Sequence, residues 1–194
     1  MKKIRYHVAM SLDGFIAGPN GEADWIVSDP EVDFVELWAQ FDTLLMGRLT
    51  YAAAVSRLGE AAFKGPKVVV VSRSLKPADH PGITVINDLT AAQLQFLRTQ
   101  PNADRGKTED RKDARQKDIW LMGGGELFRT LLEMRQVATV EVSIMPVLLG
   151  AGIRLLPSST HQAKLKLSSQ KIYRSGIVSL VYDVQTGPLN DHGQ

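Results

Sequence analysis

Three short apolar runs constrain the fold of this chain more than any other feature. Residues 43–46 stop at Gly47, residues 119–122 stop at Gly123, and residues 67–72 contain four consecutive valines. Runs without polar alternation are typical of strands that are buried on both faces, as in parallel sheets. The sequence therefore predicts a sheet whose strands are joined and covered by helices.

The order of the remaining patterns extends this prediction. Strand and helix patterns alternate as far as residue 145, and only strand patterns follow, with residues 164–173 and 177–184 forming an antiparallel pair turned at Ser175-Gly176. We therefore expect a three-layer α/β fold with a mixed, mostly parallel sheet and an antiparallel edge. The earlier strand patterns cover residues 3–10, 43–46, 67–72, 83–86, 119–122 and 137–145, and the helical patterns after the first cover 50–58, 89–100 and 126–135.

Helix boundaries follow from capping residues. Asp29-Pro30 is typical of a helix start, and either Asn87 or Asp88 is expected to cap the helix at 89–100. The apolar residues of the first helix are expected on one face: Phe34, Val35, Trp38 and Phe41.

Composition bounds the class of protein. A chain of 194 residues that is 44% hydrophobic and 23% charged suits one globular domain, which we place at residues 1–186 before a tail at 187–194. The absence of cysteine excludes disulfides and thiolate metal sites, and the four histidines lack metal-ligand spacing, so we expect no metal. No apolar run reaches the ~18 residues of a membrane span. The first residues also lack the apolar stretch of a signal peptide, so we predict a cytoplasmic protein without a membrane partner.

Residues 102–118 stand apart as a charged insertion. They hold six basic and five acidic residues and no large apolar side chain, so they cannot contribute to a core. The near balance of these charges, and a formal net charge of +2 for the whole chain, argue against a nucleic-acid partner.

The expected strand ends carry groups that suit an anion. Gly123, Gly124 and Gly125 lie between a strand and a helix, where backbone N–H groups and the helix dipole favour a phosphate. The alternative is a tight turn with no ligand.

A second and a third strand end repeat the pattern. Gly47 is followed by Arg48 and Thr50 at a helix start, and Ser72-Arg73 closes the valine strand. A guanidinium and hydroxyls at such positions suit phosphate groups, although Arg48 could also be solvated and Thr50 could be a helix cap.

Asp13 follows the first strand in a glycine-rich loop at residues 11–24. A carboxylate there could orient a polar substrate or pass protons, and the alternative is a turn-forming Asp-Gly pair.

Five motifs occur together in a fixed order: Ser11-Leu12-Asp13-Gly14-Phe15-Ile16-Ala17, Met46-Gly47-Arg48-x-Thr50-Tyr51, the strand 68–72, Gly123-Gly124-Gly125-Glu126-Leu127 and Pro146-Val147-Leu148-Leu149-Gly150-x-Gly152. This set resembles the dihydrofolate reductase-like superfamily. It is most similar to the reductase domain of the riboflavin-biosynthesis deaminase/reductase and its stand-alone relatives.

The resemblance implies an eight-stranded sheet and a cytoplasmic, homodimeric reductase that binds NADPH along the strand ends. It assigns Gly47, Arg48 and Thr50 to the cofactor phosphates, and Ser72 and Arg73 to the adenosine with its 2′-phosphate. It assigns Gly123, Gly124 and Gly125, with the adjoining Glu126, to the pyrophosphate. Asp13 and the loop after it would border the nicotinamide and the substrate.

Two functions are compatible with these features. The first is an NADPH-dependent reductase that transfers a hydride to a small heterocyclic, carbonyl or imine substrate, such as a pterin- or pyrimidine-like compound, with Asp13 as the candidate catalytic residue. The second is a non-catalytic protein that binds NADPH as a sensor. Apolar residues in the last strands and in the connection 146–152 predict a homodimer formed through the C-terminal strands.

Overall fold

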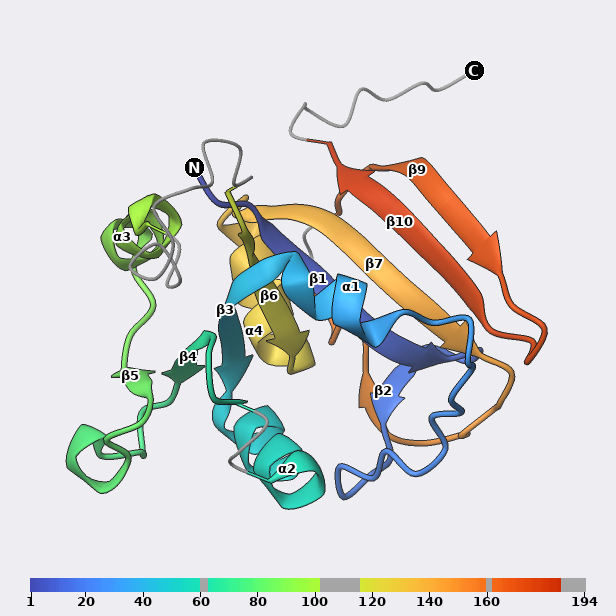
Figure 1. Cartoon of the computed structure of the whole chain (residues 1–194), viewed down its shortest axis with the longest axis horizontal. Coiled ribbons are helices and arrows are strands. Elements are labelled where there is room, and N and C mark those ends of the chain that lie inside the picture. Colours follow the sequence, from blue (N-terminus) through green and yellow to red (C-terminus); the bar gives the residue numbers. More distant parts are fainter. Residues whose placement is uncertain (60–62, 102–115, 160–161, 186–194) are drawn as a thin grey trace. The chain divides into compact units, whose positions relative to one another are not determined.

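The computed structural model describes residues 1–59, 63–101, 116–159 and 162–185. Eight strands form one sheet in the order β5-β4-β3-β6-β1-β7-β10-β9, and β2 pairs with β8 in a separate two-stranded ribbon (Figure 1). The prediction of an α/β fold with a mixed, mostly parallel, eight-stranded sheet is confirmed. Two compact units share the chain, one made of Met1–Arg5 and Val32–Gly124, the other of Tyr6–Glu31 and Gly125–Gln194.

The first unit contains the parallel strands. β3 pairs with β4 on one side and β6 on the other, and β4 pairs with β5, in each case in parallel. Its elements are the start of β1 (Ile4–Ser11), α1 (Phe34–Ala39), β3 (Phe41–Gly47), α2 (Arg48–Leu58), β4 (Lys67–Val71), the 3-10 helix η2 (Pro77–Asp79), β5 (Thr84–Ile86), α3 (Ala91–Thr99) and β6 (Asp118–Gly123).

Burial on both faces of β3 explains why its sequence does not alternate. Its residues 41–46 are all buried, as the apolar run predicts. One face packs in a cluster whose buried members are Phe41, Leu44, Met46, Val68, Val70 and Trp120. Three aromatic rings meet at this cluster: the Trp120 ring lies 5.1 Å from both the Trp38 and the Phe41 rings.

The second unit is mainly antiparallel. β10 lies between β7 and β9 and pairs antiparallel with both, which confirms the closing strand pair (Figure 1). Its elements are the rest of β1, β2 (Phe15–Ala17), α4 (Gly125–Glu133), β7 (Val137–Met145), β8 (Ile153–Arg154), β9 (Leu165–Ile172) and β10 (Val178–Val184). The apolar stripe of α4 is buried, and its Phe128 ring stacks on Tyr6 with 3.9 Å between centroids.

The predicted start of the first helix is wrong. Asp33 caps α1 by accepting a hydrogen bond from the Glu36 N–H (2.8 Å), four residues after Asp29. Asp29 instead accepts from the backbone N–H groups of Glu31 (2.8 Å) and Ser175 (3.1 Å). Hydrogen bonds from Ser175 and from the Glu31 N–H hold the pKa of the Asp29 carboxyl below its usual value.

The apolar face predicted for that helix is also wrong. α1 has six residues and none of them is buried, with Phe34 54% and Val35 82% exposed. Phe41 belongs to β3, where it is buried. Phe34, Val35 and Trp38 lie in α1 and Phe41 lies in β3, so a spacing typical of one helix here spans two elements.

Two further local predictions need correction. The helix after β5 begins at Ala91, because Thr90 and Gln93 form a reciprocal capping box that Asn87 and Asp88 do not form. The loop 11–24 contains the short strand β2, which pairs with β8.

The single domain at 1–186 stays a prediction. Most of the charged insertion, residues 102–115, and the tail 187–194 lie outside the described residues. Within the described part of the chain, no helix combines the length and hydropathy that a membrane crossing needs.

A buried ion pair fixes the first residues of the chain. The Lys2 Nζ lies 2.6 Å from both carboxylate oxygens of Asp42, and both side chains are 2% exposed. The Thr43 hydroxyl donates to the same carboxylate (2.9 Å), and the Lys2 N–H donates to the Arg98 carbonyl (2.9 Å). These bonds offset the cost of removing the Lys2 and Asp42 charges from water.

We expect Lys2→Met to lower the free energy of unfolding by about 3–5 kcal/mol, because it removes the ammonium group that lies 2.6 Å from both oxygens of the buried Asp42 carboxylate. The double variant Lys2→Met/Asp42→Leu should recover part of this loss. Urea denaturation measures both, with Lys3→Met at the neighbouring exposed position as the control. A Lys2→Met variant as stable as the Lys3→Met control would contradict this account.

Candidate functional site

The carboxyl ends of β4, β3 and β6 lie next to one another. The parallel register pairs Gly47 with Val71 and Met46 with Gly123. Arg48, Ser72 and Gly124 each follow directly in the chain, so the three turns leave the sheet at one edge. Open parallel sheets bind their ligands at this edge.

Gly47 leaves open space at the start of α2. It is the N-cap residue, with φ −79° and ψ 163°, and makes no side-chain capping bond. A Cβ built on it would meet nothing within 4 Å. The backbone conformation therefore does not require glycine, and the first N–H groups of α2 lie beside a space that a ligand could fill. Figure 1 shows β3 running directly into this helix.

Thr50 links two of the turns. Its Oγ1 accepts a hydrogen bond from the Gly124 N–H (3.1 Å), and Gly124 has φ +27°. The hydroxyl proton of Thr50 is still available for a further acceptor, since this bond uses only an oxygen lone pair. The alternative that Thr50 caps the helix is therefore wrong. Gly47 is the N-cap residue of α2, and the Thr50 hydroxyl instead bonds the turn after β6.

Ser72 and Arg73 differ in exposure. Ser72 is buried, and its Oγ accepts from the N–H groups of Ser74 (3.2 Å) and Leu75 (3.1 Å), which fixes the turn after β4. Arg73 is exposed, as is Arg48. Among residues 1–59, 63–101, 116–159 and 162–185, neither guanidinium has a hydrogen-bond or ion-pair partner. Two arginines without partners thus stand at neighbouring strand ends.

Gly125 and Glu126 begin α4 in the second unit, and the structure gives each a local role. A Cβ on Gly125 would lie 2.6 Å from the Arg154 carbonyl oxygen and 2.9 Å from the Pro157 ring, so close backbone packing requires glycine here. The Glu126 carboxylate pairs with Arg129 one turn later (2.6 Å). Their assignment to the cofactor stays a prediction.

Asp13 accepts three hydrogen bonds. The Ser11 hydroxyl donates at 2.7 Å, the Leu149 N–H at 3.1 Å and the Gly150 N–H at 2.7 Å. The hydrogen bond from Ser11 and those from the two N–H groups lower the pKa of Asp13 to about 2. The carboxylate is therefore ionised at neutral pH and acts as a hydrogen-bond acceptor.

A buried polar group in the second unit was missed by sequence reasoning. Glu141 on β7 is buried, accepts from the Thr139 hydroxyl (2.6 Å) and lies 3.2 Å from the His7 Nδ1 on β1. The signal was one acidic residue inside an otherwise apolar strand. Its partner cannot be read from spacing, since the two residues are 134 positions apart.

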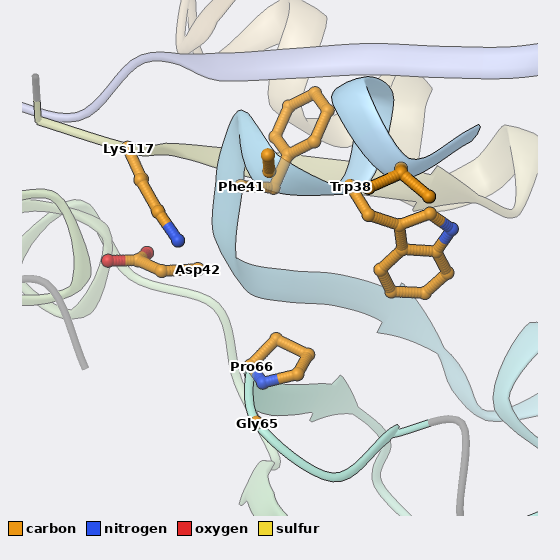
Figure 2. Close-up of a pocket in the computed structure, with 8 residues that line it drawn as sticks. Trp38, Phe41, Asp42, Gly65, Pro66 and Lys117 are labelled. Atoms are coloured by element: carbon orange, nitrogen blue, oxygen red, sulfur yellow. The ribbon is translucent and has the colours of Figure 1, made fainter. Parts of the chain in front are cut away.

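A cavity of about 250 Å³ lies at the opposite end of β3 from Gly47. It is lined by Val35, Trp38, Ala39, Phe41, Asp42, Gly65, Pro66 and Lys117. Figure 2 shows the Lys117 side chain extending toward the Asp42 carboxylate, and the Trp38 indole on another side of the hollow. Phe41 and Asp42 begin β3 and Pro66 precedes β4, so this cavity is not part of the candidate site.

Comparison with known proteins identifies relatives of nearly the whole chain. The family model for the RibD C-terminal domain matches residues 2–179. YyaP of Bacillus subtilis (strain 168) is 30% identical over 192 residues, covering 93% of this chain and 94% of the relative. YwjB of the same organism is 24% identical over 179 residues, covering 91% and 95%.

Solved structures share the fold. A protein of Shewanella sp. PV-4 assigned to riboflavin biosynthesis has a TM-score of 0.74 at 20% identity, with 95% of this chain and 99% of that chain covered. A pyrimidine reductase-like protein of Corynebacterium diphtheriae has a TM-score of 0.60 at 15% identity, covering 96% and 93%. The Thermotoga maritima diaminohydroxyphosphoribosylaminopyrimidine deaminase/5-amino-6-(5-phosphoribosylamino)uracil reductase has a TM-score of 0.63 at 16% identity, covering 95% and 57%.

Proposed function

The chain belongs to the RibD C-terminal domain family, a family of reductases, and from this premise we propose that it is an NADPH-dependent reductase of a small heterocyclic or carbonyl/imine compound. A pyrimidine-like acceptor is favoured, because the Corynebacterium diphtheriae relative is named pyrimidine reductase-like. We further propose that the enzyme works in the cytoplasm.

One observation carries the cofactor proposal. Arg48 and Arg73 are exposed, have no partner in the described part of the chain, and follow the paired residues Gly47 and Val71 of neighbouring strands, with Ser72 between Val71 and Arg73. Planar guanidinium groups bind phosphate by two parallel hydrogen bonds. A nucleotide with an additional phosphate at its adenosine end suits such a pair.

The remaining residues of this edge fit a dinucleotide. Gly47 leaves room beside the first N–H groups of α2, which would donate to phosphate oxygens. The hydroxyl of Thr50 would donate to the same groups while its oxygen holds the Gly124 turn in place. When bound, NADPH supplies the hydride, and the protein supplies orientation and electrostatics.

The sensor alternative rests on one feature of the candidate catalytic residue. Three hydrogen bonds from within the protein, from Ser11, Leu149 and Gly150, already occupy both carboxylate oxygens of Asp13, which gives it a structural role that needs no turnover. Incubation of the protein with NADPH and a panel of pyrimidine, pterin, imine and carbonyl acceptors separates the two functions. Oxidation of NADPH with any acceptor supports the reductase, and tight binding without oxidation of any of them supports the sensor.

The proposed homodimer uses the C-terminal strands. All eight residues of β9 are exposed, including Leu165 (44%), Leu167 (45%) and Ile172 (74%), and β9 is the last strand of the sheet. An exposed apolar edge strand offers unpaired backbone groups to a second chain. The apolar residues of β10, such as Leu180, are half-buried, so the exposed area lies mainly on β9. Light scattering should give twice the mass of the 21.4-kDa chain, and a monomer at micromolar concentration would refute the dimer.

We expect NADPH to bind more tightly than NADH. A bidentate contact of Arg48 or Arg73 to the 2′-phosphate would contribute ~1.5–3 kcal/mol, roughly ten- to a hundredfold in affinity. Titration of both cofactors by calorimetry measures this difference. An Arg48→Ala/Arg73→Ala variant should bind both cofactors equally, and a variant that keeps the preference would overturn the assignment.

We expect Gly47→Thr to weaken NADPH binding about tenfold and to leave the free energy of unfolding within about 1 kcal/mol. Threonine is about as good an N-cap as glycine, but its side chain would fill the open space and its oxygen would occupy an N–H group of α2. Calorimetry and urea denaturation measure the two effects.

Gly82→Thr is the matched control, since a Cβ on Gly82 would also meet nothing within 4 Å, and Gly82 precedes the amino end of β5, away from the carboxyl strand ends of the candidate site. A Gly47→Thr protein that binds NADPH as the unmodified chain does would show that Gly47 serves only the turn.

A further inference from the structure

Asp13 joins two segments of the second unit that are far apart in the chain. Its Oδ1 accepts from the Ser11 hydroxyl and the Leu149 N–H, and its Oδ2 accepts from the Gly150 N–H. The partners on the second segment are 136 and 137 residues away. The Asp13 carboxylate therefore makes a tertiary contact, beyond the hydrogen bond within its own turn.

Backbone bonds fasten the same two segments on either side of the carboxylate. The Leu12 N–H donates to the Val147 carbonyl, and the Leu155 N–H donates to the Gly14 carbonyl, both at 2.9 Å. The turn that carries Asp13 is thus bonded to Val147, near the start of the connection between β7 and β8, and to Leu155, directly after β8.

The two segments also pack too closely at Gly152 for any side chain at that position. A Cβ on Gly152 would collide with the Ala17 carbonyl oxygen, and the antiparallel β2–β8 pair brings Phe15 opposite Arg154. The Arg154 guanidinium lies over the Phe15 ring, 5.2 Å from its centroid. At the tip of the connection, Leu149 and Gly150 are bonded to the first segment through Asp13.

The turn at the tip directs two successive N–H groups at this carboxylate. Gly150 has φ +72°, and it and Leu149 direct successive N–H groups to opposite oxygens of one carboxylate. Successive N–H groups in this arrangement form an anion-binding concavity, which here is filled by the protein's own side chain. Leu148, 69% exposed, is the large apolar side chain that the turn presents.

We propose that Asp13 is a positioning residue, whose carboxylate fastens the Leu149–Gly150 turn to the Ser11–Gly14 turn, and that it does not deliver the proton of the reduction. The second half of this statement rests on the proposed function, and the first half does not. Both oxygens of the carboxylate already accept hydrogen bonds, which favour its ionised form and lower its pKa, so Asp13 is a poor acid at neutral pH.

Amide hydrogen exchange tests the first half without any turnover. In ¹⁵N-labelled protein, Asp13→Asn should speed exchange of the Leu149 and Gly150 N–H groups about ten- to hundredfold, because hydrogen bonds to a charged acceptor are lost. Asp24→Asn removes the same charge from an exposed position of the same loop and should leave both rates unchanged. Equal rates in the Asp13→Asn protein and the unmodified chain would overturn the proposal.

The pH dependence of the unmodified protein gives a second readout that survives a folding defect in the variant. Asp13 is ionised in the folded state down to about pH 2, so the Leu149 and Gly150 N–H signals should stay constant from pH 7 to about pH 4. A titration of both signals with a midpoint near 3.8, the ordinary value of an aspartate, would overturn the proposal.

Kinetics test the second half with any acceptor that oxidises NADPH. For a positioning residue, Asp13→Asn should raise the acceptor KM while the pH profile of kcat keeps its shape. Loss of one limb of that profile, with the Leu149 and Gly150 exchange rates intact, would identify Asp13 as the proton donor and overturn the proposal. Should no acceptor react, the proposed function fails, and the exchange measurements still decide the positioning role.

Discussion

The parallel register of β4, β3 and β6 is the constraint on which the candidate site depends. Residues on both faces of β3 are buried, so a slip of one residue would exchange the side chains packed on each face. The register that results pairs Gly47 with Val71 and Met46 with Gly123. Most positions at the carboxyl ends of these strands are taken by buried apolar residues, so the polar and charged groups of the candidate site lie where the chain leaves the sheet. The positions of Arg48, Ser72 and Thr50 follow from the packing of the core.

The elements of the fold that depend on local burial were predictable, and those that depend on distant partners were not. The bounds of β7 and the buried stripe of α4 follow from apolar patterns that tertiary packing reinforces. The start of α1 was misplaced because Asp29 is a good N-cap by type, yet its carboxylate is held by the Ser175 N–H, 146 residues away. The strand β2 has three residues and a partner of two, too short for any period to appear.

The candidate site shows the same division. Residue types at the strand ends indicate an anion site, but they do not separate a glycine that leaves room for a ligand from one that packs against backbone. Gly47 is of the first kind, and Gly125 is of the second, because the Arg154 carbonyl lies where its Cβ would be. The pairing of Lys2 with Asp42 was invisible for a related reason. A charged residue next to an apolar run carries no local sign of the counter-charge that permits its burial.

The ionised state of Asp13 also bears on the class of acceptor within the proposed function. A fixed negative charge opposes the growth of negative charge near it and stabilises positive charge. Hydride transfer to a carbonyl builds an oxyanion, whereas transfer to a protonated imine or heterocycle consumes a positive charge. If Asp13 borders the acceptor, as the family resemblance implies, its negative charge favours the second kind of acceptor, because it favours protonation of that acceptor before the hydride arrives. On this condition the turn that Asp13 fastens need not supply an acid, and a nitrogen heterocycle fits the proposed function better than a simple ketone.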